Sequence, residues 1–229
     1  MPWPALEINV VRPYIHRTSL FTPQTDRSIT SNMSKEDSRK ILVKTMQNAL
    51  QSKGLHGVGL TEILKTAGLP KGSLYYHFPG GKEELALAAI ANAEQEMARF
   101  LEQMFARFDD PLEALAAWID SALQRIAASR FKLGCPLAAA ALDCSPEDTD
   151  LLLALNGAFN NLSGLLTRQI SRAGFPAEAA ADLAVLVLTS YEGGLIMARA
   201  AGSTDPIERS FRALLSHVRL QQKEFADGH

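Results

Sequence analysis

The stretch that decides the fold runs from Ala67 to Leu85 and reads AGLPKGSLYYHFPGGKEEL. The residues before it, 60–67, have the spacing of a short helix. Gly68 supplies a turn and Pro70 stands where a helix begins, so a second short helix is predicted to about Phe78. Two short helices joined by a three- to four-residue turn that contains glycine are typical of a helix-turn-helix.

The second helix of this pair has side chains that a DNA major groove can accept. Short polar or glycine residues at its start let the backbone approach base edges, and the aromatic residues after them can reach bases or phosphates. Lys82, at the start of the next helix, suits a phosphate. We therefore expect DNA contacts from Lys71, Gly72, Ser73, Tyr75, Tyr76, His77 and Lys82. The alternatives are that one tyrosine belongs to the core, that His77 bonds locally and that the lysines are only solvated.

The rest of the chain is also predicted to be helical. Ser34 and Asp37 resemble a capping box that opens a first helix, and Gly54 closes it. Start and stop residues predict six further helices, at about 82–108, 110–130, 136–143, 145–174, 176–202 and 205–223. No segment shows strand-like alternation. The predicted fold is all-α, with a three-helix head (residues 34–82) and a six-helix body (residues 83–229).

Residues 1–33 differ from the rest, because they contain four prolines and no sustained helical period. We expect a disordered N-terminal extension. Two alternatives are that Met33 is the true start and that this segment is a basic arm for a DNA groove, although its formal charge is only +1.

The charge of the chain is unevenly distributed. The 229 residues carry a formal net charge of −2, which by itself would argue against a nucleic-acid partner. Residues 34–82, however, contain eight Lys and Arg against three Asp and Glu, a formal charge of +5. Residues 83–229 contain 12 basic and 20 acidic residues, a formal charge of −8. A small basic head on an acidic body favours DNA binding through the head.

Other features narrow the class of protein. Two cysteines cannot form a disulfide framework and fit a reducing compartment. No segment has the pattern of an export or membrane signal, so we expect a cytoplasmic protein without a membrane partner. No catalytic or metal-binding motif stands out, so we expect neither an enzyme nor a cofactor.

The body offers apolar surface with a few embedded polar groups. Such residues are candidates to line a ligand pocket between helices, although residues at this helical spacing are more often plain core. The candidates are Phe100, Met104, Trp118, Phe131, Cys135, Leu155, Asn156, Phe159 and Glu192. Cys135 precedes a predicted helix start, where the helix dipole would favour its thiolate; a redox or electrophile sensor is therefore an alternative to a packed thiol.

The last two predicted helices carry apolar stripes suited to self-association. One stripe comprises Leu183, Leu186, Val187, Tyr191, Leu195 and Ala198, and the other Ile207, Phe211, Leu214, Leu215 and Val218. Part of each stripe must be intramolecular core, and the remainder is predicted to form a two-fold interface.

With these residues the chain resembles transcriptional repressors of the TetR/AcrR family. The loop from Phe78 to Lys82 is one residue longer than the usual family pattern, and with residues 134–137 (GCPL) it resembles the lincomycin-resistance repressors. The resemblance implies a dimer that binds a pseudo-palindromic double-stranded DNA operator and is released by a small, largely apolar or aromatic effector. It also adds Thr61, otherwise a helix-capping residue, as a phosphate contact. A ligand-free activator or architectural DNA binder, and a helical enzyme or carrier with a vestigial head, remain alternatives.

Overall fold

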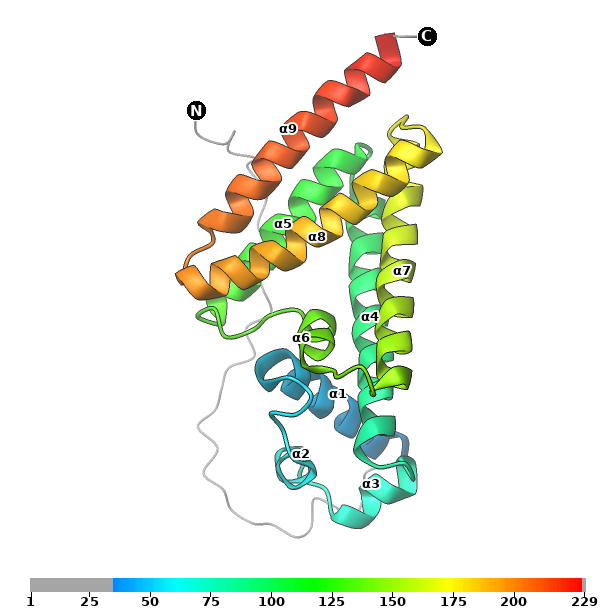
Figure 1. Cartoon of the computed structure of the whole chain (residues 1–229), viewed down its shortest axis with the longest axis vertical. Helices are drawn as coiled ribbons and strands as arrows, with labels where there is room; N and C mark the ends of the chain where they lie inside the picture. Colours follow the sequence, from blue (N-terminus) through cyan, green and yellow to red (C-terminus); the bar gives the residue numbers. More distant parts are fainter. Residues whose placement is uncertain (1–34, 228–229) are drawn as a thin grey trace. The chain divides into compact units, whose positions relative to one another are not determined.

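The structure, a computed structural model, describes residues 35–227, with side chains described as far as Gln222. The predicted N-terminal extension and the capping residue Ser34 lie outside the described residues. Over this range the chain forms nine α-helices and no strand, which confirms the all-α prediction (Figure 1). The helices are α1 (Lys35–Lys53), α2 (Leu60–Ala67), α3 (Lys71–His77), α4 (Lys82–Arg107), α5 (Pro111–Ala128), α6 (Pro136–Asp143), α7 (Thr149–Arg172), α8 (Ala177–Ala201) and α9 (Asp205–Asp227).

The head consists of α1, α2 and α3 around a small apolar core. Leu42, Met46 and Leu50 on α1 are fully buried, as is Leu74 on α3. Gly68 ends α2 with φ of 66°, in the left-handed region that glycine adopts without strain. The turn between α2 and α3 is therefore as short as the sequence predicts.

The long helix α4 belongs to both parts of the molecule. Its first turns pack against α1, and it then runs beside α7, as Figure 1 shows. Further along the chain, α7 packs against α8, and α8 packs against α9. The short helix α6 lies against α1, which is the second place where the body touches the head.

One predicted helix start is wrong. The sequence Ser145-Pro146 was expected to open the helix that Gly174 follows, but α7 begins at Thr149. The carboxylate of Asp148 instead accepts hydrogen bonds from the backbone N–H of Ser145 at 2.7 Å and from its hydroxyl at 2.9 Å. Such local side-chain bonds hold the backbone in a turn rather than in a helix.

Helix α8 is long and apolar enough to cross a membrane when judged by length and composition alone, contrary to the expectation that no segment is. In its most apolar window, 44% of the residues are buried against neighbouring helices. A core helix of a helical bundle meets the same criterion, so this composition is explained by packing.

Candidate nucleic-acid interface and pocket

Helix α3 presents a row of exposed side chains to solvent. Leu74 is fully buried and Phe78 is 1% exposed, so these two residues anchor α3 to the core. Lys71 and Gly72 are exposed, and Tyr75 and Tyr76 are 45% and 61% exposed. The alternative that one tyrosine is a core residue is therefore wrong. Large aromatic rings held outward on a helix-turn-helix are available to contact bases or phosphates.

The first turns of α1 lie beside these aromatic rings and add positive charge. The ammonium of Lys35 is 5.0 Å from the centre of the Tyr76 ring, and the Arg39 guanidinium is 5.2 Å from that of Phe78. The Tyr76 hydroxyl raises the pKa of the Lys35 ammonium by accepting its hydrogen bond. Lys35 and Arg39 could not be identified from sequence, because which residues of α1 face α3 depends on how the helices pack.

At the N-terminus of α4, a backbone donor is already hydrogen-bonded to a side chain of the same helix. Gly81 adopts φ of 74°, and the backbone N–H of Gly80 donates to the Glu84 carboxylate at 2.8 Å. Lys82, at the first position of α4, is half-buried and forms no ion pair among the described residues. Its ammonium is therefore available to a phosphate, whereas the Gly80 N–H is not. Thr61 is exposed on the first turn of α2.

A pocket of about 530 Å³ lies between the head and the body. Its lining comes from α1, α4, α5, α8 and the loop before α6. Much of the surface is apolar and aromatic: the Trp118 and Tyr191 rings are 4.6 Å apart between centres and tilted by 37°. The Arg125 guanidinium lies 4.8 Å from the centre of the Phe100 ring. The volume is within the range for a drug-sized molecule.

The pocket includes three of the nine residues proposed from sequence as ligand contacts, namely Phe100, Trp118 and Cys135. Met104 and Leu155 are buried in the core, Phe131 and Phe159 are half-buried against it, and Asn156 is exposed on α7. Glu192 is next to Tyr191 but is not in the lining. The pocket also contains Tyr191, Arg125 and the α1 residues, which were not among the ligand contacts proposed from sequence.

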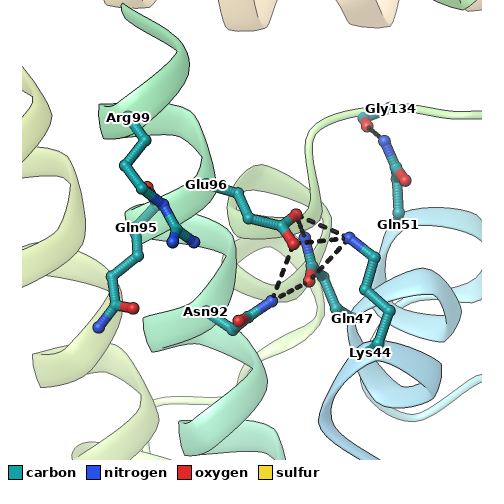
Figure 2. Close-up of polar contacts among 8 residues, drawn as sticks. All are labelled: Lys44, Gln47, Gln51, Asn92, Gln95, Glu96, Arg99 and Gly134. Carbon is teal, nitrogen blue, oxygen red and sulfur yellow. Dashed lines mark hydrogen bonds and ion pairs between the residues drawn. The ribbon is translucent and has the colours of Figure 1, made fainter. Parts of the chain in front are cut away.

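A polar cluster joins α1 to α4 at the pocket, and Figure 2 shows its geometry. The Glu96 carboxylate accepts from Lys44 Nζ at 2.9 and 2.7 Å and from Gln47 Nε2 at 2.8 Å. Asn92 Nδ2 donates to Gln47 Oε1 at 2.6 Å and to Glu96 Oε1 at 3.3 Å. Gln47 is only 7% exposed, so these hydrogen bonds satisfy a buried polar side chain. Partial burial would raise the pKa of Glu96, but the bonds from Lys44, Gln47 and Asn92 hold it below its usual value.

Two further hydrogen bonds attach the head to the body near α6. Gln51 Nε2 donates to the backbone carbonyl of Gly134 at 2.6 Å (Figure 2). The backbone N–H of His56, in the α1–α2 loop, donates to the Asp143 carboxylate at 2.5 Å. A displacement of α6 or of the loop before it would therefore act directly on α1.

Cys135 and Glu192 form a buried pair beside the pocket. Cys135 is 5% exposed, and burial together with the nearby Glu192 carboxylate raises the pKa of its thiol well above the usual value. The backbone N–H groups of α6 act in the opposite direction, as predicted from the helix start, but their effect is smaller. Burial also raises the pKa of Glu192 to about 7, and neither of its oxygens has a hydrogen-bond partner in the described range.

The apolar stripes predicted for α8 and α9 are mostly core. All the stripe residues except Leu186 are buried, because they form the contact between α8, α9 and the rest of the body. The exposed apolar residues of α8 lie on its opposite side as two adjacent pairs, eleven positions apart. They are Val185, Leu186, Ile196 and Met197, exposed by 43 to 61%; Leu220 on α9 is exposed by 62%.

Within the part of the chain that the structure describes, no group of three or more His, Cys, Asp or Glu could hold a metal ion.

Comparison with known proteins assigns the family. The profile of the bacterial regulatory proteins of the tetR family matches residues 47–89, and that of the LmrA/YxaF-like transcriptional regulator C-terminal domain matches residues 111–213. YxaF of Bacillus subtilis, an HTH-type transcriptional regulator, is 30% identical over 164 residues, which cover 72% of this chain and 86% of YxaF. The chain belongs to the TetR family of transcriptional regulators.

Two other similarities agree with this assignment. The HTH-type transcriptional regulator LmrA of the same organism is 28% identical over 175 residues, covering 76% of this chain and 93% of LmrA. The crystal structure of a TetR regulatory protein from Rhodobacter sphaeroides is 26% identical, with a TM-score of 0.71, over 79% of this chain and 98% of that one. The TetR family consists of DNA-binding regulators rather than enzymes, and the LmrA-like subgroup is the one that the GCPL motif and the longer loop predict.

Proposed function

We propose that this chain is a cytoplasmic, ligand-responsive repressor that binds a pseudo-palindromic operator as a homodimer and is released by a small, largely apolar or aromatic effector. Residues 34–82 form its DNA-binding domain and residues 83–229 its ligand-binding and dimerisation domain. The observation that carries the proposal is that one pocket is lined by residues of both parts. A molecule bound there contacts Gln47 and Gln51 of α1 together with Trp118 and Tyr191 of the body.

DNA binding is assigned to α3 and the residues around it. The exposed Lys71, Tyr75 and Tyr76 would enter a major groove, while Thr61 and Lys82 would contact phosphates on either side. Gly72 lets the helix approach base edges, and Ser73 and His77, both half-buried, are secondary contacts. Lys35 and Arg39 add phosphate contacts from α1.

The pocket supplies a physical route from ligand to DNA. Glu96, Lys44 and Gln47 hold α1 against α4, and Gln51 holds α1 to the loop before α6. A ligand that fits better when these hydrogen bonds are rearranged favours the rearranged state of the protein. In that state the heads no longer match two successive major grooves, roughly 34–36 Å apart.

The dimer interface is assigned to the exposed apolar face of α8 together with α9. Val185, Ile196 and Met197 are each more than half exposed, and exposed apolar side chains on one face of a helix favour an interaction surface. In a two-fold dimer the same face packs against its copy. Met197→Glu should therefore yield monomers in sedimentation velocity, whereas Leu153→Glu, at an equally exposed leucine on α7, should not.

The alternative of redox or electrophile sensing through Cys135 has no support in its surroundings. The thiolate is the reactive species, and a buried thiol with a raised pKa forms little of it. Cys135→Ser should leave the response to oxidants unchanged.

A gel-shift titration with the region upstream of the chain's own gene tests the assignment of the head. Lys71→Ala and Tyr76→Phe should each weaken binding, with the dimer intact in sedimentation. Unchanged affinity in both variants would contradict the assignment. A footprint with and without candidate ligands tests release.

A further inference from the structure

We infer that the pocket takes an organic monoanion: a compound with an apolar ring body and one carboxylate, bound through Arg125. This inference rests on the proposed function, because it names the chemical class of the effector for the same pocket. It follows from the charged groups that line the pocket and from the partners that each of them already has.

The pocket has three charged side chains in its lining: Lys44, Glu96 and Arg125. Lys44 and Glu96 neutralise each other at 2.7 Å. Arg125 is exposed and has no carboxylate partner among the described residues; its guanidinium lies over the face of the Phe100 ring. The lining therefore carries one unpaired positive charge, which matches a ligand with one negative charge.

A cationic ligand would find no free carboxylate in this lining. The Glu96 carboxylate accepts four hydrogen bonds, two from Lys44, one from Gln47 and one from Asn92. A carboxylate offers about four lone-pair positions, so Glu96 is saturated. Arg125 is in the opposite situation, because its planar guanidinium can donate two parallel hydrogen bonds to a carboxylate.

Neighbouring groups fit the same ligand. The Tyr191 phenol makes no hydrogen bond with any described residue, and burial raises its pKa, so it stays protonated and can donate. Arg125 is close enough to lower that pKa in part. The tilted Trp118 and Tyr191 rings and the Phe100 ring provide apolar surface for the body of the ligand.

Three probes that share one ring system test the inference: biphenyl-4-carboxylate, biphenyl-4-carboxamide and 4-phenylbenzylamine. Binding to the full chain is measured by isothermal titration calorimetry. A charge-assisted pair with arginine corresponds to roughly a tenfold or larger preference for the carboxylate over the amide. Arg125→Gln should reduce this preference below about twofold while leaving the affinity for the amide unchanged.

Arg99→Gln is the matched control. It removes the same charge from α4, but its Nε donates to the carbonyl of Gln95 and it is not in the lining; Figure 2 shows its side chain apart from the cluster around Glu96. It should keep the full preference. Any of four results would overturn the inference: equal affinity for the carboxylate and the amide, tightest binding of the amine, no binding of any probe, or a preference for the carboxylate that survives Arg125→Gln. Gel shifts with the same samples distinguish failure of this inference from failure of the proposed function. If the inference fails but the unmodified chain still binds the operator, the assignment as a regulator stands. If the unmodified chain does not bind the operator, that assignment is refuted.

Discussion

Replacing Glu96 with alanine removes one acceptor that serves three donors in the cluster between α1 and α4. Gln47 is only 7% exposed, and its side-chain amide then lacks the acceptor that Glu96 provides at 2.8 Å. An orphaned buried donor costs about 1–3 kcal/mol. The Lys44–Glu96 pair adds at most about 1 kcal/mol, since its side chains are 50% and 40% exposed. Asn92 loses little, because Gln47 Oε1 still accepts from it.

We therefore expect Glu96→Ala to lower the free energy of unfolding by about 2–3 kcal/mol. Urea unfolding followed by circular dichroism at fixed protomer concentration measures this as a lower midpoint with an unchanged slope. Glu102→Ala is the control, because Glu102 is exposed on the same helix and should cost no more than about 0.5 kcal/mol.

The pH dependence gives a second readout of the same variant. The donors around Glu96 hold its pKa below the usual 4.5, despite the opposing effect of burial. A carboxyl with a lowered pKa in the folded state contributes stability above its unfolded pKa, and this contribution disappears as pH falls through the folded pKa. The difference between the unmodified chain and Glu96→Ala should therefore shrink below about pH 4. A loss no larger than that of Glu102→Ala would refute the role of the cluster.

Three further changes test other parts of the structure. Glu192→Gln should be as stable as the unmodified chain near pH 4 and more stable by up to about 3 kcal/mol near pH 8. The reason is that burial disfavours the ionised carboxyl of Glu192, which forms as pH rises from 4.5 through about 7. Equal urea midpoints for the two proteins at pH 8 would contradict this. Gly194→Ala places a Cβ 2.9 Å from Cγ1 of the buried Ile207 and should lower the free energy of unfolding by about 1–3 kcal/mol. Gly193→Ala, with open space around the new Cβ, should be neutral or stabilising. Similar melting temperatures for the two variants would count against this packing. Lys82→Ala should weaken operator and random DNA alike and reduce the slope of affinity against salt by about one, and an unchanged slope would remove Lys82 from the phosphate contacts.

The helices could be predicted closely from sequence because their ends are encoded locally. Gly68, Gly202 and Pro136 stop or start helices through backbone preferences that need no tertiary information. The start of α7 was missed because the sequence alone did not show that Asp148 would bond Ser145 and hold a turn.

The pocket could be predicted only in part. Trp118 and Phe100 were found as large side chains on amphipathic helices, but the contribution of α1 was not, because helical periodicity does not say which helices pack together. The stripes on α8 and α9, predicted to be part core and part interface, are mostly core for a related reason. Both sides of α8 are apolar, so the pattern could not separate the core residues from Val185, Ile196 and Met197.

The hydrogen bond from Gln51 ends on the backbone carbonyl of Gly134 rather than on a side chain. A main-chain acceptor is present whatever residue occupies the position, and no atom within 4 Å would obstruct a Cβ at Gly134. The neighbouring pocket residues can therefore be exchanged for others that recognise a different compound while this attachment persists. Such an arrangement would allow descendants of this chain to acquire new inducers without rebuilding the connection to the DNA-binding helices.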